Sequence, residues 1–344
     1  MKKQNQYSSK NFLKKMFIKI CRILGYEIID QSNFYVSTQE KNLNENLNIQ
    51  GKKSINLPLG EVKISRKVNS FSVIFRSCTK VNMLTQNKKR LFDKDKSEYT
   101  FRSLNSIIKS INHSIKTFPN ISFDIVVIDH ISKSEDLDKI KNLLNSSNIN
   151  NSIINLKVDE FTKDIKKINA KNENVTDNQM SNMSNIHKSL IAAKNQCKDL
   201  VYFVEDDYIH VKEAFNEMII TYERISSQLN KELILCPVDY PYLYTKMDSS
   251  SILLGANKHW RRVEETLCTF CTSKILINKY WNKFVSMCQF EHYPFEQPLH
   301  EIYKLEYCLS PIPSLAIHYT NINSIFGLSP NVDWKKIWDE NKDY

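Results

Sequence analysis

Hydrophobic residues in the middle of the chain fall into short, mainly apolar runs separated by longer stretches of mixed character. The runs at residues 71–75, 123–128 and 200–204 are rich in β-branched and aromatic residues, which predicts buried strands. Between the first two runs, apolar residues recur at spacings of three and four, which predicts a helix with one apolar face. The residues of that face are Phe101, Leu104, Ile108, Ile111, Ile115 and Phe118.

The alternation of strands and helices continues along the chain. Ser134, followed by two acidic residues and an apolar pattern, predicts an N-capped helix, and residues 152–158 predict another strand. A polar loop is expected over 159–183 and a further helix over 185–197. Such repeated units indicate an α/β fold with a mostly parallel, Rossmann-like sheet flanked by helices. The ligand site of such a sheet lies beyond the carboxyl ends of its strands.

The first 30 residues follow a different pattern. Apolar residues at helical spacing, with lysines between them, predict a basic amphipathic helix within residues 1–30: Phe12, Leu13, Met16, Phe17, Ile20, Cys21 and Leu24. Seven Lys and Arg residues against Glu27 and Asp30 leave a net charge of +5 here, half of the chain's +10. Such a helix suits an anionic membrane surface, and it equally suits docking on its own domain with a solvated lysine face.

Composition and local bias set the expected organisation of the 344 residues. With 41% hydrophobic and 25% charged residues and only 5 Gly and 9 Pro, the chain has the composition of a folded globular protein. Residues 31–68 are rich in Asn, Gln, Ser and Lys, which predicts a polar linker or arm. A catalytic domain is therefore expected over residues 69–330, followed by a C-terminal tail over 331–344.

Several classes of protein are disfavoured. No run of 18 apolar residues is free of charges and the N-terminus lacks a signal peptide's apolar stretch, so we expect a cytoplasmic protein; peripheral binding at the inner face of the cell membrane through residues 1–30 is one interpretation. Eight scattered cysteines do not form a secreted disulfide framework. The C-x-x-C of Cys268 and Cys271 lacks a second pair at zinc-finger distance and predicts reduced thiols in a strand. The basic residues do not interleave with aromatic ones, so no nucleic-acid partner is expected.

The run at 200–204 ends in three consecutive carboxylates, Glu205, Asp206 and Asp207. Negative charge gathered at the end of a buried strand is costly unless a cation joins it. A hard divalent ion, Mg²⁺ or Mn²⁺, is the natural partner of carboxylate oxygens and would neutralise charge on a leaving diphosphate. The alternative is an acidic strand-to-helix turn that helps to cap a helix beginning near Val211.

Three segments in this order resemble the GT-A nucleotide-sugar glycosyltransferases, in particular glycosyltransferase family 2. They are an opening strand at 72–77, a second strand at 123–129 that ends in Asp129, and the acidic motif at 205–207. The resemblance covers roughly residues 70–330. One departure concerns the second strand, which the family often continues as Asp-Gly-Ser, whereas Asp129 is followed here by His130, Ile131 and Ser132.

The resemblance implies roles for residues at matching positions. Asp207, Asp206 and His318 would hold Mn²⁺ or Mg²⁺, the histidine following a Pro-stiffened apolar segment at 311–317. A neutral imidazole suits Mn²⁺ better than Mg²⁺. Ordinary strand-end, helix-surface and core roles remain the alternatives for these residues and for the implied donor-binding set, which comprises Arg76, Ser77, Thr79, Asp129, Lys188, Glu205 and Asp206.

An inverting transfer also needs a carboxylate that takes the proton from the acceptor hydroxyl. Glu296, at the start of a predicted helix, is the first candidate, because GT-A enzymes usually hold the base in this part of the chain. Glu264 and Glu265 are its rivals, although Arg261 and Arg262 beside them could equally be their salt-bridge partners. For each of these glutamates a surface-helix role is the alternative.

The resulting hypothesis is a metal-dependent glycosyltransferase. It would move a sugar from a UDP- or GDP-linked donor to a glycan or lipid-linked acceptor in cell-surface polysaccharide synthesis. A nucleotidyltransferase is the nearest alternative, but such enzymes usually carry a Gly-rich basic loop after the first strand, where this chain has Arg76 and Lys80 and no Gly. A basic nucleic-acid-binding protein without catalysis is the alternative from another class.

Overall fold

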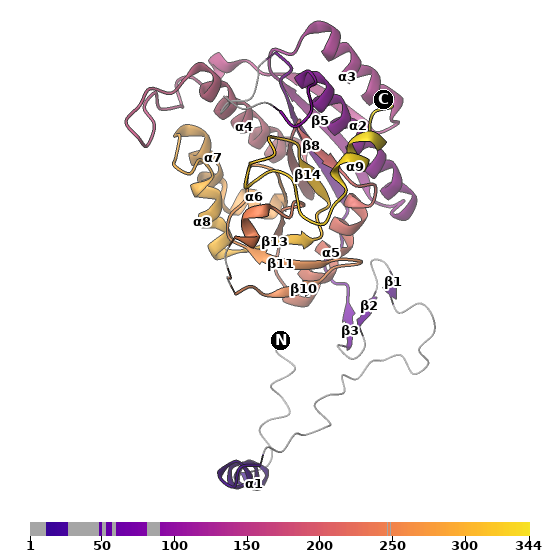
Figure 1. The fold of residues 1–344 in the computed structure, drawn as a ribbon, viewed down its shortest axis with the longest axis vertical. Helices are drawn as coiled ribbons and strands as arrows, with labels where there is room; N and C mark the ends of the chain where they lie inside the picture. The colour runs from indigo at the N-terminus through magenta and orange to yellow at the C-terminus, as the bar shows by residue number, and fades with distance from the viewer. Residues whose placement is uncertain are drawn as a thin grey trace. The chain divides into compact units, whose positions relative to one another are not determined.

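A computed structural model describes residues 12–26, 48–49, 53–56, 60–80, 90–245, 247 and 249–344, in two compact units (Figure 1). The first unit comprises Met1–Lys67 with Glu223–Lys231. Its described residues include helix α1 (Phe12–Ile23) and a small antiparallel sheet. That sheet lies within the predicted polar arm and consists of β1 (Asn48–Ile49), β2 (Lys53–Asn56) and β3 (Gly60–Lys63).

The second unit, Val68–Tyr222 with Glu232–Tyr344, is built on a nine-stranded sheet in the order β10-β11-β13-β9-β12-β7-β4-β5-β6. The four strands β6, β5, β4 and β7 are parallel neighbours, while β12 and β11 run against the others. The predicted mostly parallel sheet is thus confirmed. Its strands are β4 (Ser70–Ser77), β5 (Ser122–Asp129), β6 (Asn150–Asn155), β7 (Leu200–Glu205), β9 (Leu233–Leu235), β10 (Ile252–Leu254), β11 (His259–Val263), β12 (Phe270–Ser273) and β13 (Tyr307–Ile312).

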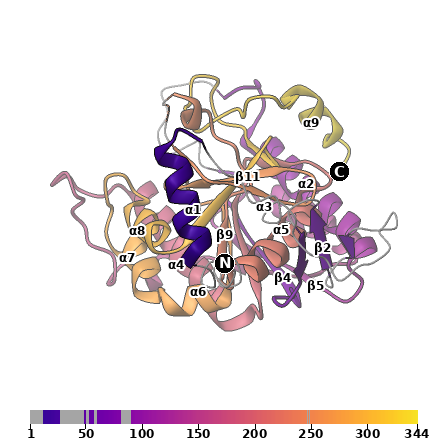
Figure 2. The same cartoon turned by 90° about the horizontal axis from the view of Figure 1, so that it is seen from below.

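Helices flank this sheet, as predicted (Figures 1 and 2). Helix α2 packs against α3, whereas α4 packs on β4 and β5 and against α6 and α7. The helices of this unit are α2 (Lys96–Thr117), α3 (Ser134–Ser146), α4 (Asp177–Gln196), α5 (Ala214–Leu229, of which residues 223–229 belong to the first unit), α6 (Lys274–Lys279), α7 (Trp281–Gln289), α8 (Gln297–Leu305) and α9 (Trp334–Glu340), with short 3-10 turns at Val158–Glu160 and Pro241–Tyr244.

The core lies on both faces of the central strands. All eight residues of β4 are buried, because helices cover both of its sides and sheet neighbours cover both of its edges. Cys268 and Cys271 are buried thiols beside and within β12, which agrees with the predicted packing role. None of the helices in the described part of the chain is long and apolar enough to cross a membrane.

Helix α4 begins earlier than the sequence pattern predicts. Residues 177–183 were expected to be loop, but the helix starts at Asp177 because Thr176 and Gln179 form a capping box. The Thr176 side chain accepts from the Gln179 backbone N–H, and the Gln179 side chain accepts from the Thr176 N–H. This early start places two additional helical turns at the carboxyl end of the sheet, where they form one wall of a cavity.

A second, two-stranded sheet lies beside the large one. It pairs β8 (Tyr208–His210), directly after the acidic motif, with β14 (Ala316–His318). The segment 331–344, predicted as a tail, contains α9, whose Ile337 and Trp338 are buried. The Trp338 ring stacks on Phe92 at 4.2 Å between ring centroids, so α9 closes a cluster over β8, β14 and the start of α2.

Candidate active site

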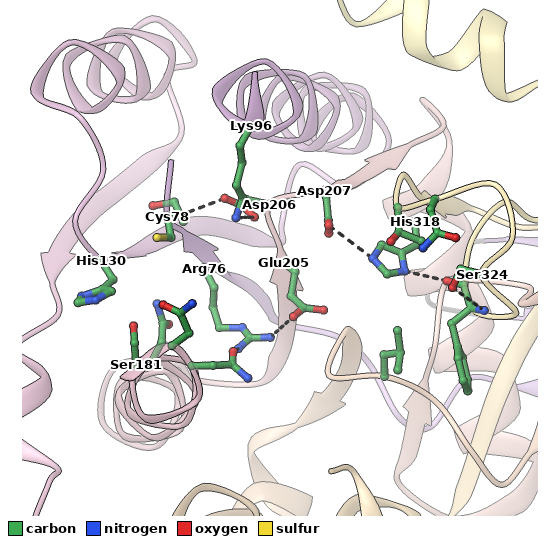
Figure 3. A pocket seen from close by; sticks show the side chains of 18 of the residues that line it. Arg76, Cys78, Lys96, His130, Ser181, Glu205, Asp206, Asp207, His318 and Ser324 are labelled. Carbon is green, nitrogen blue, oxygen red and sulfur yellow. Dashed lines mark hydrogen bonds and ion pairs between the residues drawn. The ribbon is translucent and has the colours of Figure 1, made fainter. Parts of the chain in front are cut away.

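A cavity of about 470 Å³ opens at the carboxyl ends of β4 and β7 (Figure 3). Strand β4 connects onward to β5 on one side, whereas β7 lies on its other side, so the cavity sits where the strand order reverses. Ligands of open α/β sheets bind at such a point. The volume lies within the range of small-molecule and cofactor pockets. Its lining comprises Arg76, Ser77, Cys78, Lys96, His130, Asn178, Ser181, Asn182, Asn185, Glu205, Asp206, Asp207, Leu267, Glu296, His318, Thr320, Asn321, Ser324 and Phe326.

The parallel register of β4 and β7 pairs Arg76 with Glu205 across the two strand ends. The Arg76 Nη2 lies 2.8 Å from Glu205 Oε1, and its Nη1 donates to Asn182 Oδ1 at 3.1 Å. Burial alone would lower the pKa of Arg76, but Glu205 together with Asp206 and nearby thiols outweighs burial, so the pKa is raised. The Glu205 side chain keeps about a third of its surface exposed toward the cavity.

Asp206 is held by three groups of the protein. Lys96 Nζ, from the first turn of α2, lies 3.0 Å from its Oδ1 (Figure 3). Its Oδ2 accepts from the Cys78 backbone N–H at 3.1 Å and from Thr100 Oγ1 at 2.9 Å. Both carboxylate oxygens are therefore occupied by donors, and Asp206 joins the end of β4 to α2.

Among the described residues, the side chain that Asp207 contacts directly is His318, whose Nε2 lies 3.5 Å from Asp207 Oδ2. The antiparallel pairing of β8 with β14 aligns Tyr208 with His318, and their rings stack at 4.4 Å. His318 Nδ1 lies 2.7 Å from the Phe326 carbonyl, which can only accept, so Nδ1 carries a proton. The Asp207 carboxylate favours a proton on Nε2 as well, and loss of that proton would free the Nε2 lone pair for a metal ion.

Electrostatics reinforce this pair. Burial alone would raise the pKa of Asp207, but His318, Lys96 and Arg90 outweigh burial and hold the pKa at about 2. Burial alone would lower the pKa of His318, but Asp207, with smaller contributions from Glu205 and the Phe326 carbonyl, outweighs burial and raises the pKa. A histidine whose other nitrogen is fixed by a backbone carbonyl, next to a carboxylate, is the arrangement that first-row divalent metals use.

The charges on the cavity wall show what the pocket can accept. Four carboxyl groups line it, from Glu205, Asp206, Asp207 and Glu296, against the two permanent cations of Arg76 and Lys96. The excess of negative charge fits a bound cation. In the described part of the chain no three His, Cys, Asp or Glu side chains converge closely enough to hold a metal by themselves. Asp207 and His318 would supply two ligands, which suits Mg²⁺ or Mn²⁺ when phosphate and water complete the shell.

Glu296 lies at the N-cap of α8 and lines the same cavity. Burial, with a smaller contribution from the Glu205 charge, raises its pKa to about 7. Its carboxyl is 3.9 Å from the Cys268 thiol. A carboxyl with a pKa near neutrality can gain or lose a proton during turnover, which makes Glu296 a candidate general base.

Arg90 adds a cation near Asp207. Its two terminal nitrogens are buried and have no hydrogen-bond partner in the described part of the chain. The guanidinium lies over the Tyr99 ring, 4.9 Å from its centroid. A buried guanidinium without an acceptor is costly, and phosphate oxygens match its planar donor geometry.

The remaining implied donor residues of the strand ends are engaged within the protein. Asp129 Oδ1 accepts from Ser77 Oγ at 2.7 Å and from Ser132 Oγ at 2.5 Å. The Thr79 hydroxyl accepts from the Lys133 backbone N–H at 3.0 Å. Ser77 lines the cavity, whereas Asp129 and Thr79 lie behind its wall and brace the loops that form it.

Three other implied residues lie outside the cavity lining. Lys188 is on α4, but it faces Glu160 at 3.2 Å because it falls on the outer face of that helix. Glu264 and Glu265 are exposed after β11, and Glu264 is 3.9 Å from Arg262. Of the three candidate bases, the structure brings only Glu296 to the acidic motif.

The sequence pattern did not identify several residues that line the cavity. Asn178, Ser181, Asn182 and Asn185 recur at helical spacing along α4 and form a polar wall opposite His318 (Figure 3). The capping-box pattern at Thr176 could have predicted the early start of α4, which places these residues on a helix. Lys96 and Thr100 lie just before the predicted apolar helix face. Their contacts with Asp206 join residues more than one hundred positions apart in the sequence, so no local pattern reveals them.

Comparison with known proteins finds likeness of fold only. No protein-family model and no curated protein sequence matches the chain. Among solved structures, UDP-glucose pyrophosphorylase complexed with UDP-glucose is similar over 79% of this chain and 96% of its own, with 5% identity and a TM-score of 0.38. The galactosyltransferase LgtC, in complex with donor and acceptor sugar analogues, is similar over 79% and 95%, with 8% identity and a TM-score of 0.35.

A third similar structure is GalNAc-T7 with UDP, GalNAc and Mn²⁺, with 12% identity and a TM-score of 0.43. The match covers 80% of this chain and half of GalNAc-T7. Two of these three structures are thus glycosyltransferases, the class that the sequence resembles, while membership of family 2 stays a prediction. With TM-scores below 0.5, the likeness carries no argument about activity, which depends on the geometry of the cavity itself.

Proposed function

We propose that this chain is a glycosyltransferase that uses a nucleotide diphosphate sugar as donor and a divalent cation as cofactor. One observation carries the proposal. A carboxylate and histidine pair, Asp207 and His318, shares a single cavity with a carboxyl of near-neutral pKa, Glu296. Asp207 and His318 suit the binding of a metal ion that holds a diphosphate. Glu296 suits the removal of a proton from a hydroxyl.

The donor end of the cavity is assigned to the acidic motif. Asp207 and His318 would hold Mn²⁺ or Mg²⁺, which supplies charge neutralisation on the leaving diphosphate. Arg90 lies outside the cavity lining and would add positive charge near Asp207 at this end. Lys96 stays with Asp206 and sets the position of the motif. The polar wall of α4 offers amide and hydroxyl groups to the hydroxyls of the nucleoside or sugar.

Glu296 is assigned as the base for the acceptor hydroxyl. The acceptor oxygen attacks the anomeric carbon, the bond from that carbon to the diphosphate oxygen breaks, and the proton of the hydroxyl passes to Glu296. The products are the lengthened acceptor and a nucleoside diphosphate. A nucleotidyltransferase would instead use a sugar phosphate as nucleophile, which is already ionised and needs no base. A carboxyl of near-neutral pKa such as Glu296 therefore has a role in transfer to a hydroxyl that it lacks in transfer to a phosphate.

The acceptor is assigned to a hydroxyl of a glycan or lipid-linked saccharide, as the resemblance implies, and the donor to the UDP or GDP series. A role in cell-surface polysaccharide synthesis follows from the same resemblance. The cavity's polar lining is consistent with a sugar ligand, because most of its side chains carry hydrogen-bonding groups.

The test starts with donor binding and then follows the released product. The full chain would be heated with UDP- and GDP-sugars, with and without Mn²⁺, because a ligand of the folded state raises its melting temperature. The best donor would then be incubated with acceptor saccharides. Release of nucleoside diphosphate supports the proposal. Formation of pyrophosphate from a nucleoside triphosphate and a sugar 1-phosphate, with no turnover of nucleotide sugars, would assign the chain to the nucleotidyltransferases instead.

A further inference from the structure

Helix α1 in the first unit has two faces of opposite character. Successive residues of an α-helix are separated by about 100° around its axis. On this basis its apolar residues occupy one continuous half of the circumference, whereas its basic residues share the other half with Ile18. The apolar half contains Phe12, Leu13, Met16, Phe17, Ile20, Cys21 and Ile23, continued by Leu24, and the basic half contains Lys14, Lys15, Lys19 and Arg22.

Most described side chains of the apolar half of α1 are exposed, whereas Cys21 is half-buried. The exposed fractions are 59% for Phe17, 46% for Ile20, 77% for Ile23 and 66% for Leu24. Each of these side chains would gain on the order of 1 kcal/mol or more by leaving water. Such a continuous exposed apolar face marks an interaction surface, in contrast to single exposed residues, which are common on proteins.

The charges identify the partner. No acidic residue lies in α1, and Lys14 and Lys19 fall at the two borders of its apolar half. A helix that lies flat at a bilayer surface places its apolar half among the acyl chains, while lysines at the borders reach up to the phosphates. A nucleic acid would pair with the basic half but leave the apolar half in water. With 12 residues the helix is far too short to cross a bilayer, which needs about 20.

We propose that α1 binds in the plane of an anionic lipid bilayer, with Phe17, Ile20 and Leu24 inserted and Lys14 and Lys19 at the phosphate level. The proposal is independent of the proposed function, because no residue of α1 lines the cavity. The surface potential of an anionic membrane contributes about 1 kcal/mol per basic residue, a roughly fivefold gain in binding for each. The insertion of apolar side chains adds a contribution to the binding free energy that salt does not screen.

The experiment uses the full chain and flotation with vesicles. We expect the chain to float with vesicles that contain phosphatidylglycerol in phosphatidylcholine, and to remain largely unbound with phosphatidylcholine alone. Raising the salt from 50 to 500 mM should weaken binding at least tenfold, because the electrostatic part is screened. Equal binding to both vesicle types, or no binding to either, would overturn the proposal.

A matched exchange variant tests the faces of the helix. Combining Lys19→Ile with Ile20→Lys keeps composition and net charge but moves a lysine into the centre of the apolar half. We expect it to lose binding at least tenfold, whereas Lys19→Arg should bind like the wild type. Retained binding by the exchange variant would contradict insertion of this face. If the wild type does not bind and the exchange lowers the melting temperature, α1 packs on protein instead, which also rejects the proposal.

Turnover of a soluble donor separates this inference from the proposed function. The exchange variant should lose vesicle binding while keeping the wild-type rate in solution, because the cavity is unchanged. A wild type that binds anionic vesicles but turns over no nucleotide sugar would reject the proposed function and leave the membrane assignment in place.

Discussion

The acidic motif contains two regions that are neutralised in different ways. Glu205 and Asp206 face the permanent cations of Arg76 and Lys96, which come from β4 and α2. Asp207, the next residue, faces an imidazole from β14 and has no lysine or arginine within salt-bridge distance in the described part of the chain. An arginine or lysine keeps its charge at any physiological pH, whereas an imidazole can be neutral or charged as its surroundings require.

The difference suggests that the three consecutive residues Glu205, Asp206 and Asp207 have different roles. Removing the carboxylate of Asp206 would leave a buried ammonium without its partner, so this residue stabilises the fold of the cavity. Removing the carboxylate of Asp207 leaves a histidine that can simply be neutral, so this residue is available to exchange its partner for a metal ion. The following variants test whether Asp206 and Asp207 differ in this way.

The largest effect is expected for Asp207→Asn. The amide keeps the shape of the side chain but not its charge, so metal-dependent donor turnover should fall at least about a thousandfold, as loss of several kcal/mol of transition-state stabilisation implies. The melting temperature should also fall at neutral pH, because a pKa held at about 2 against 3.8 corresponds to roughly 2 kcal/mol of stability, so turnover is compared at a temperature at which the variant is folded. Turnover and Mn²⁺ dependence would be measured at saturating donor. Activity within tenfold of the wild type would remove Asp207 from the metal site.

Glu296→Gln should lower the rate constant of transfer by about a hundredfold or more while donor affinity stays within twofold. The pH dependence gives a second readout. Because burial raises the pKa of Glu296 to about 7, the group is protonated and inactive as a base below that pH, and wild-type transfer should rise as pH passes through 7. The residual activity of the glutamine variant should lack this rise. A variant that retains the rise would exclude Glu296 as the base.

The same substitution should affect stability in the opposite direction. A folded-state pKa raised above its ordinary value of 4.5 means that folding opposes ionisation of Glu296. This penalty is absent at pH below 4.5 and complete above about 7. The glutamine variant should therefore be at least as stable as the wild type at pH 8, as judged by urea unfolding. A clearly less stable variant at pH 8 would indicate a structural role.

Asp206→Asn tests whether Asp206, in contrast to Asp207, mainly stabilises the fold of the cavity. Lys96 and Thr100 would lose a charged acceptor in a buried place, and breaking a buried ion pair typically costs about 3 kcal/mol or more. Urea unfolding at neutral pH should show a larger loss for Asp206→Asn than for Asp207→Asn, for which the pKa of about 2 corresponds to roughly 2 kcal/mol. If the two variants are equally stable, the proposed division of labour fails.

Much of the fold was readable because it depends on local pattern. The apolar runs at 71–75, 123–128 and 200–204 became the cores of β4, β5 and β7. Alternation with helices then places the ends of β4 and β7 side by side, which brings Arg76 to Glu205. The sequence also pointed to His318, Asp207 and Glu296, which the structure gathers around one cavity.

The rest depends on contacts that no local pattern contains. Lys96 meets Asp206 because α2 packs on β8, directly after the acidic motif, and the Phe326 carbonyl orients His318 from a loop after β14. The outward direction of Lys188 was missed for a different reason. A basic residue near the nucleotide was expected from the resemblance, whereas helix periodicity places the inward face of α4 at Asn178, Ser181, Asn182 and Asn185.

The smallest effect is expected for Lys188→Ala, which tests this reading of α4. Lys188 and Glu160 form a partly exposed ion pair, and such pairs contribute about 0.5 kcal/mol or less. Stability should therefore change little, and donor affinity should stay within twofold, whereas Asn182→Ala on the inward face should weaken donor binding by removing an amide beside Arg76. Thermal shift with the best donor measures both. If Lys188→Ala weakens donor binding more than Asn182→Ala, the donor extends beyond the cavity toward Glu160, and the assigned division of α4 into two faces is wrong.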